Sequence, residues 1–150
     1  MTRVDFYVLG EAGEADRYRF ACRLVEKIYQ QNRRAYIHTG SEEEARQLDR
    51  LLWTYRQDSF LPHGLHGKVN ALLNPILIGW GEDPGSENDV LINLAPEIPM
   101  FFSRFERVSE IVDTDPQVRE LGRQRYRFYR DRGYPLESHQ IEPSTRGERR

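Results

Sequence analysis

Short apolar runs alternate with segments of helical periodicity along most of the chain. Runs typical of buried strands lie at residues 3–9, 35–39, 75–80, 90–94 and 107–112. Apolar residues three and four positions apart predict a helix over about 15–31. A capping box from Ser41 to Glu44 predicts a second helix that continues through Tyr55. Strands that alternate with helices favour a mostly parallel sheet covered on both faces, so we expect a three-layer α/β fold.

The last predicted helix, residues 115–133, has well-marked ends. Asp115 is a good N-cap, and Pro116 stands where its missing N–H costs nothing. Gly133 suits the left-handed conformation that commonly follows the last helical residue. We therefore expect this helix to end just before Gly133.

The two sides of this helix differ in character. At about 100° per residue, one side holds Val118, Leu121, Phe128 and Tyr129. The other side holds Arg119, Arg123, Tyr126, Arg127 and Arg130, and Arg125 and Arg132 add to its positive field. A charged helical stripe is commonly a solvated surface, but solvated helices usually mix both signs of charge. Because guanidinium groups suit carboxylate and phosphate oxygens, this side is interpreted as a docking face for an anion, either phosphates or an acidic peptide.

The remaining segments carry weaker signals. Residues 63–74 are predicted to form a loose segment, and residues 95–102 a short helical or irregular link before the last strand. The polar composition after residue 136 predicts a disordered tail over 137–150. We expect a single domain over 1–136, with no internal repeat.

Composition and charge narrow the classes of function. The chain has 150 residues, 38% of them hydrophobic, with a formal net charge of −2, so contact with a polyanion has to be local. A single cysteine, Cys22, excludes an internal disulfide and a zinc site built on several cysteines. There is no apolar run of about 18 residues and no signal-peptide pattern at the N-terminus. The expected compartment is therefore the cytoplasm, with no membrane partner.

The sequence lacks the usual signatures of catalysis and cofactor binding. The loop after the first strand has no G-x-G-x-x-G spacing, and Glu11 and Glu14 place negative charge where a pyrophosphate would bind. The expected fold is thus Rossmann-like without a nucleotide-binding loop, and no cofactor is predicted. His63 and His66 lack further ligands for a metal and are expected to be solvated loop residues, so no metal site is predicted.

Two further candidates for a nucleophile or a catalytic pair are also weak. Cys22 lies close to the core stripe of its helix and is expected to be a small buried hydrophobe. His38 and Thr39 form a polar pair at the end of the second strand, but a single histidine does not define a catalytic site. No catalytic residue is predicted.

Trp53 and Phe60 form a second unusual feature. A Trp near the end of a helix and a Phe in the following loop are most often part of the core. Aromatic residues in such a place are also typical anchors for a partner protein. Both interpretations remain open for Trp53 and Phe60, whereas Leu52 is expected in the core.

Three segments together resemble the chi subunit family of bacterial DNA polymerase III. They are the opening FYVL strand, LDRLLWTYRQDSFLPH from Leu48 to His63, and RELGRQRYRFYRDRGY from Arg119 to Tyr134. The resemblance covers residues 1–136 and implies a non-catalytic accessory subunit of the clamp-loader assembly. It also implies a pocket on the last helix for the C-terminal tail of single-stranded DNA-binding protein, an acidic peptide that ends in Pro-Phe.

Carried over by resemblance, Arg123 binds the terminal carboxylate of that tail, and Arg119 and Arg127 bind its aspartates. Val112 and Tyr126 would contact the Phe ring, with Gly133 also lining the apolar part. The residues so implied are Val112, Arg119, Arg123, Tyr126, Arg127 and Gly133.

The resemblance further implies a second protein contact. Trp53 and Phe60 match the aromatic positions through which the family binds the psi subunit of the clamp loader, a surface that can also engage a helicase. An alternative is a protein that binds single-stranded nucleic acid directly, with the Arg side of the last helix along the phosphates and Tyr126 stacked on a base. The net charge of −2 argues against this alternative. No sequence-specific recognition of nucleic acid is expected, and an enzyme acting on small nucleotides would rest on fold analogy alone.

Overall fold

The computed structural model describes residues 1–10, 16–55 and 60–141. Within these ranges the strands are β1 (Arg3–Leu9), β2 (Ala35–His38), β3 (His63–Leu65), β4 (Ile76–Gly79), β5 (Val90–Asn93), β6 (Arg107–Val112) and β7 (Leu136–Ile141). The helices are α1 (Arg17–Gln30), α2 (Glu42–Thr54) and α3 (Pro116–Asp131), with a short 3-10 turn at Phe102–Arg104. The described strands form one sheet of order β3-β4-β2-β5-β6-β1-β7, in which each adjacent pair is parallel.

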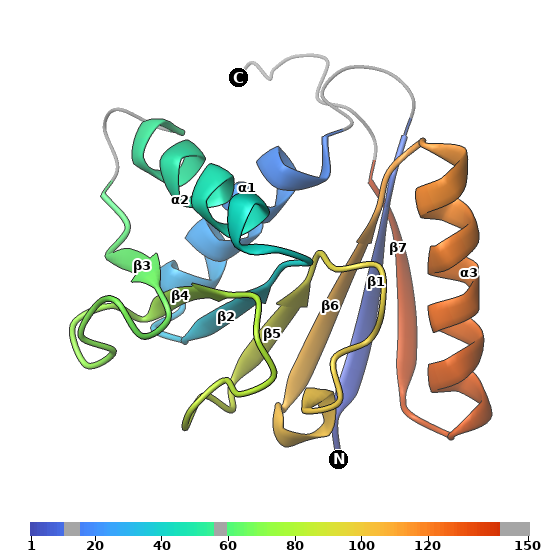
Figure 1. Ribbon diagram of the computed structural model, residues 1–150. Coiled ribbons are helices and arrows are strands. Elements are labelled where there is room, and N and C mark those ends of the chain that lie inside the picture. Colours follow the sequence, from blue (N-terminus) through green and yellow to red (C-terminus); the bar gives the residue numbers. More distant parts are fainter. Residues whose placement is uncertain (11–15, 56–59, 142–150) are drawn as a thin grey trace.

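Helices cover both faces of this sheet (Figure 1). Side chains alternate between the faces of a strand. On one face, Leu9 and Ile37 pack with apolar residues of α1 and α2. On the other face, Phe6 and Leu91 pack with Tyr129 of α3. The predicted three-layer, Rossmann-like α/β fold is therefore confirmed.

Local capping explains where α1 and α2 begin. Asp16 accepts a hydrogen bond from the Tyr18 amide at 2.8 Å, so α1 starts at Arg17. Ser41 Oγ accepts from the Glu44 amide at 3.2 Å, as the capping box predicts. The Glu44 carboxylate, however, accepts from the Gly40 amide at 3.0 Å, one residue earlier than the usual capping-box partner.

The ends of α3 agree with the sequence prediction. Asp115 Oδ1 accepts hydrogen bonds from the Gln117 and Val118 amides at 2.8 and 3.3 Å, and Pro116 is the first helical residue. Gly133 has a φ of 79°, the left-handed conformation expected just beyond the helix. Residues 95–102 form the predicted irregular link, with helical geometry only in the 3-10 turn that begins at Phe102.

The prediction of a disordered tail from residue 137 is wrong for residues 137–141. These residues belong to β7, which pairs in parallel with β1, with Val4 opposite Leu136 and Leu9 opposite Ile141. The sequence LESHQI is mostly polar because β7 is an edge strand with several exposed side chains, so it lacks the apolar pattern of a buried strand. Residues 142–150, and the loop positions Glu11 and Glu14, lie outside the described residues.

His63 is buried, so the prediction of a solvated loop histidine is wrong for this residue. It opens the short strand β3, and its Nδ1 lies 2.6 Å from the carbonyl oxygen of Leu61. Its Nε2 lies 3.4 Å from the Asp49 carboxylate. His66 is half-buried, and its ring meets Tyr36 edge-on at 5.5 Å. His63 is buried because the three-residue strand β3 packs against α2. The local sequence resembles a loop and does not indicate this packing.

The predicted burial of Cys22 is confirmed. The Cys22 side chain is fully buried among α1, α2 and the sheet, and burial raises the pKa of its thiol to about 12. The thiol therefore remains protonated and apolar at neutral pH. Among the described residues, no helix is both long and apolar enough to cross a membrane.

Candidate functional site

A hollow of about 180 Å³ lies between α3 and the β6-β1-β7 part of the sheet. Gly122 allows α3 to approach β6 closely here, because an added Cβ would lie 2.8 Å from a methyl group of Val112. The hollow is lined by Phe6, Val8, Val112, Arg119, Gly122, Arg123, Tyr126 and Ser138. Three strands and one helix thus build it together.

The inner part of the hollow is apolar. Phe6 and Val8 lie on the same face of β1, and Val112 ends the adjacent strand β6. Tyr126 closes one side, with its ring edge-on to Phe6 at 5.2 Å. An apolar cavity of about 150 Å³ holds a benzene ring, so the size and lining suit one aromatic side chain.

Two arginines of α3 border this apolar hollow, in different settings. Arg119 is half-buried, and its Nε donates to the Asp113 carbonyl at 3.1 Å. This bond fixes its guanidinium in place. Arg123 is exposed, and its Nη1 lies 3.0 Å from the Glu120 carboxylate. Glu120 and Arg123 are a solvated pair of a kind that contributes little to stability, so Arg123 is available to an anionic ligand.

Two of the residues that the resemblance implies do not line the hollow. Arg127 is exposed one residue beyond Tyr126, outside the lining. Gly133 is exposed and follows the end of α3, where its positive φ serves the helix terminus. The structure therefore brings Val112, Arg119, Arg123 and Tyr126 together around the hollow, whereas Arg127 and Gly133 are not among its lining residues.

Arg125 and Arg132 differ from the prediction that they add to an exposed positive field. Arg125 is buried, and its Nε donates to the Glu110 carboxylate at 2.8 Å. Arg132 is exposed, but its guanidinium lies 3.7 Å from the centre of the Phe128 ring, on the apolar side of the helix. By the same rotation per residue, Arg125 falls between Leu121 and Tyr129, so the helical pattern already contained the signal that it faces inward.

Sequence reasoning missed four lining residues. Phe6 and Val8 carry a signal, because alternate residues of one strand share a face. Gly122 carries a second signal, since a glycine inside a helix usually has a packing reason. Ser138 has none, because it belongs to the unpredicted strand β7.

Trp53 and Phe60 are exposed and lie together at the end of α2. Their side chains are 57% and 65% exposed, and the ring centroids are 5.9 Å apart. Trp53 also rests on the buried His63 ring at 4.6 Å. Leu52 is buried, as predicted. The structure thus answers the question left open by the sequence: these two aromatic residues are outside the core.

The sequence model of the family described as DNA polymerase III chi subunit, HolC, matches residues 1–137. This chain belongs to the DNA polymerase III chi subunit family. A DNA polymerase III subunit chi from Pseudomonas aeruginosa is 43% identical over 141 residues, which cover 94% of this chain and 98% of that protein. Chi subunits from Haemophilus influenzae and Escherichia coli are 31% and 28% identical, each over 91% of this chain and at least 95% of the relative. Membership places the chain among the replication accessory subunits of DNA polymerase III.

The chi fold also resembles a solved structure of unrelated sequence. The crystal structure of T4 UvsW matches with a TM-score of 0.68 and 10% sequence identity, over 94% of this chain. This chain spans 42% of the T4 UvsW chain. At this identity the likeness concerns the fold alone.

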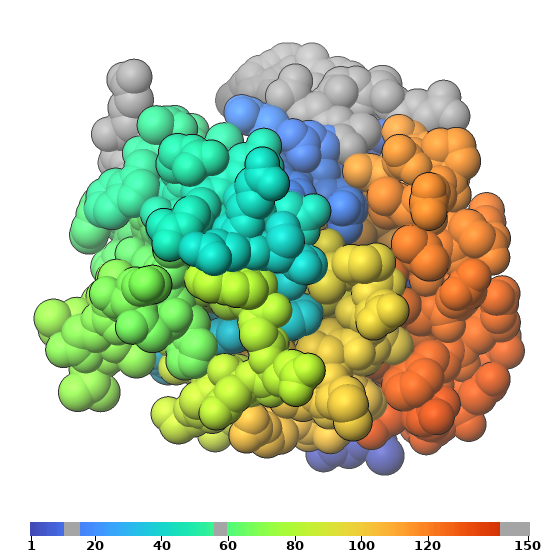
Figure 2. All heavy atoms as spheres, viewed as in Figure 1, coloured from blue at the N-terminus to red at the C-terminus, as the bar shows by residue number. Residues whose placement is uncertain are grey.

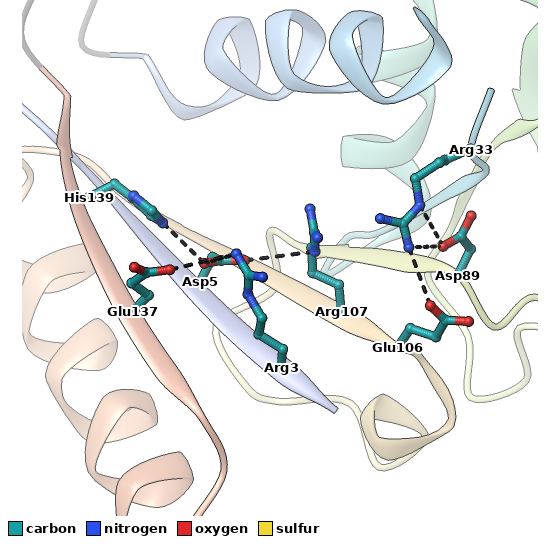
Figure 3. A network of polar contacts seen from close by, with 8 residues as sticks. All are labelled: Arg3, Asp5, Arg33, Asp89, Glu106, Arg107, Glu137 and His139. Atoms are coloured by element: carbon teal, nitrogen blue, oxygen red, sulfur yellow. Dashed lines mark hydrogen bonds and ion pairs between the residues drawn. The ribbon is translucent and has the colours of Figure 1, made fainter. Parts of the chain in front are cut away.

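The sheet of this chi-family chain carries an ion-pair cluster on the face opposite α3 (Figure 3). Asp5 of β1 is 1% exposed, and its Oδ1 lies 3.0 Å from His139 Nε2 and 3.6 Å from Arg3 Nη2. Arg3 Nη2 also lies 3.6 Å from the Glu137 carboxylate, and Arg107 Nε lies 4.0 Å from Asp5.

This cluster contains a set of potential metal ligands. One ligand atom each of Asp5, Glu137 and His139 lies within 4.8 Å of the others. Arg3 and Arg107, however, already supply positive charge to the two carboxylates. A divalent cation would have to displace these guanidinium groups, so the arrangement is better suited to joining β7 to β1 than to binding a metal.

Proposed function

We propose that the chain is a non-catalytic adaptor of the DNA polymerase III holoenzyme. In this proposal the α3 hollow binds the acidic C-terminal tail of single-stranded DNA-binding protein. Trp53 and Phe60 bind the psi subunit of the clamp loader, and a helicase can use the same surface. The adaptor thereby links the clamp loader to protein-coated single-stranded DNA during replication.

The chemistry of the hollow supports the first contact. An apolar cavity for one ring, bordered by Arg119 and Arg123, suits a peptide that ends in Phe with a free carboxylate. In the proposal, Arg123 binds the terminal carboxylate, and Val112 and Tyr126 contact the Phe ring. Arg119 and Arg127 attract the aspartates that precede it. The single observation that carries the proposal is this pairing of an apolar hollow with the guanidinium groups of Arg119 and Arg123, within the chi family.

The exposure of Trp53 and Phe60 supports the second contact. Two large aromatic side chains in contact with each other and largely exposed are typical anchors of a protein interface. His63 beneath Trp53 is buried and hydrogen-bonded to the chain, so it provides a fixed base for the indole ring. A fixed anchor loses little conformational entropy on binding.

Isothermal titration tests the tail site. A peptide ending in Asp-Asp-Ile-Pro-Phe should bind the purified chain, and Arg123→Ala should weaken binding by about 1.5–3 kcal/mol, roughly 10- to 150-fold, because a charge-assisted hydrogen bond is lost. Higher salt should also weaken binding, because the participating charges are exposed. With the wild type, amidation of the peptide C-terminus should cause most of the same loss of affinity. With Arg123→Ala, amidation should cause little further loss.

Arg130→Ala is the matched control on the same helix. Arg130 is exposed, pairs with the adjacent Asp131 and does not line the hollow, so its removal should change the affinity by no more than about twofold. Equal losses in the two variants would indicate a general charge effect and overturn the assigned pocket. Binding of a plain oligonucleotide in preference to the peptide would favour direct recognition of single-stranded nucleic acid instead.

A further inference from the structure

Large apolar side chains that face solvent are concentrated near the β3 edge of the sheet. Among the described residues, seven large apolar side chains are exposed, and five of them lie between residues 53 and 73. Two of the five, Leu72 and Leu73, are 90% and 70% exposed, more than either Trp53 or Phe60. Single exposed apolar residues are normal on a protein surface, whereas a group of them marks an interaction site.

The segment after β3 forms a hydrogen-bonded turn that carries these two leucines. Asn70 Oδ1 accepts from the Leu72 amide at 2.9 Å, and the Asn70 carbonyl accepts from the Leu73 amide at 3.1 Å. Asn74 Nδ2 also donates to the Asn70 carbonyl, at 2.9 Å. The backbone of the turn is therefore ordered by its own side chains.

Arg34, at the start of β2, holds this turn against the sheet. Its Nη2 donates to the Ala71 carbonyl at 3.0 Å and to the Asn74 carbonyl at 3.4 Å. The Glu87 carboxylate accepts from Nε and Nη2 of the same guanidinium, at 3.1 and 2.8 Å. Two exposed leucines on a fixed turn lose little conformational entropy when a partner covers them.

The turn and the exposed aromatic pair meet at the same two strands. His63 of β3 stands opposite Ile76 of β4, and the Ile76 amide donates to the Pro62 carbonyl at 3.4 Å. Phe60 and Leu73 each come three residues before one of these paired positions, so they enter the sheet on neighbouring strands, about 4.8 Å apart. In Figure 2 the green part of the chain, which contains both segments, projects at the left of the molecule. The two features therefore belong to one continuous surface.

This surface carries little charge. Lys68 is the only Lys, Arg, Asp or Glu residue between positions 60 and 75. Val69 packs on β3, where a Cβ added to Gly64 would lie 2.7 Å from a Val69 methyl group. A solvated protein surface usually contains many charged side chains of both signs. The composition suits an apolar protein partner rather than solvent or a polyanion.

We propose that Leu72 and Leu73 extend the surface of Trp53 and Phe60, so that one partner contacts all four side chains across the β3 edge. The inference rests on the proposed function, in which that partner is the psi subunit. Because both leucines project into solvent, the partner has to provide an apolar hollow for them beside its site for the aromatic pair. The added apolar area strengthens the contact.

Surface plasmon resonance with purified psi and the full chain tests the extension. Leu72→Ser combined with Leu73→Ser should weaken binding by about tenfold or more, because apolar area buried in the complex is lost. The thermal unfolding midpoint should not fall, since both side chains are exposed in the free chain. Met100→Ser, which removes a 96% exposed apolar side chain elsewhere, is the matched control and should keep the affinity within about twofold of the wild type.

Phe60→Ala, measured alongside, separates this inference from the proposed function. Weaker binding of both Phe60→Ala and the paired leucine variant would support the extension. A loss with Phe60→Ala alone would overturn the extension and leave the psi contact standing, whereas full affinity of both variants would overturn the two together. If the paired leucine variant keeps its affinity for psi but loses self-association in sedimentation experiments, the turn joins two copies of this chain and the extension is wrong.

Discussion

The buried carboxylate of Glu110 connects its own strand, β6, to the neighbouring strand β5 and to α3. Its Oε1 accepts from Arg125 Nε at 2.8 Å, and its Oε2 accepts from Tyr129 Oη at 2.7 Å and from Asn93 Nδ2 at 3.1 Å. Arg125 also donates to the Pro96 carbonyl at 2.9 Å. Burial, together with the Glu110 charge, raises the pKa of the Tyr129 phenol, so this hydroxyl remains a donor. The network therefore fixes α3 and the 95–101 link against the sheet.

We expect Arg125→Met to destabilise the protein by about 3–5 kcal/mol, because it leaves Glu110 buried without its guanidinium partner. Arg127→Met should change the free energy of unfolding by no more than about 0.5 kcal/mol, since Arg127 is exposed on the same helix. Urea unfolding of the two variants measures the difference. Similar stabilities would show that the Glu110 network does not fix α3.

At the scale of elements, β7 has a mostly polar sequence and only one neighbouring strand. Backbone pairing with β1 runs from Leu136 to Ile141. Two side-chain contacts of His139 add to this pairing: its Nε2 lies 3.0 Å from Asp5, and its ring stacks on Tyr7 at 4.9 Å. Because Ser138 of β7 lines the α3 hollow, the placement of this edge strand also shapes the candidate site.

His139→Ala should cost about 1–3 kcal/mol in the free energy of unfolding, because it leaves the buried Asp5 carboxylate without this hydrogen bond. The variant should also increase amide hydrogen exchange in β7 more than in β6, which has strands on both sides. Glu137→Ala is the matched control, because Glu137 is mostly exposed and its pair with Arg3 is long, at 3.6 Å. If Glu137→Ala lowered the free energy of unfolding as much as His139→Ala does, the result would contradict the role given to His139.

At the scale of the whole molecule, the two proposed protein contacts lie at opposite edges of the sheet. The α3 hollow involves β7 at one edge, and the Trp53 surface adjoins β3 at the other (Figure 1). Six strand spacings of about 4.8 Å separate these edges by roughly 29 Å. This is several Debye lengths at physiological salt, so charges at one contact have little influence on the other. The two proposed contacts are therefore compatible with each other.

Phe60→Ala should abolish co-purification with psi, because a largely exposed aromatic anchor is removed. The same variant should bind the acidic tail peptide with an affinity within about twofold of the wild type. Met100→Ala, at another strongly exposed apolar position, serves as the control and should retain both contacts. Persistent co-purification of Phe60→Ala with psi would remove Phe60 from the interface, and a parallel loss of tail binding would contradict the independence of the two sites.

The sequence by itself determined the features that depend on near neighbours in the chain. Alternation and helical spacing predicted β1 and β6 with their bounds, and the cap at Asp115 with Gly133 predicted the ends of α3. Side-chain periodicity and helix capping depend on residues within a few positions of one another. They can therefore be recognised from the sequence alone. Helical rotation also placed Arg119, Arg123 and Tyr126 on one side, which the structure finds around one hollow.

Only the tertiary structure decided which of these side chains meet distant partners. Arg123 and Arg125 are two positions apart, yet one is exposed and the other is buried because Glu110 lies opposite it on β6. β7 is a strand because β1 offers it an open edge, although its own sequence is polar. Trp53 and Phe60 lie outside the core, with the Trp53 ring over the buried His63 ring of β3. Each outcome depends on residues far away in the chain, and no local pattern specifies that geometry.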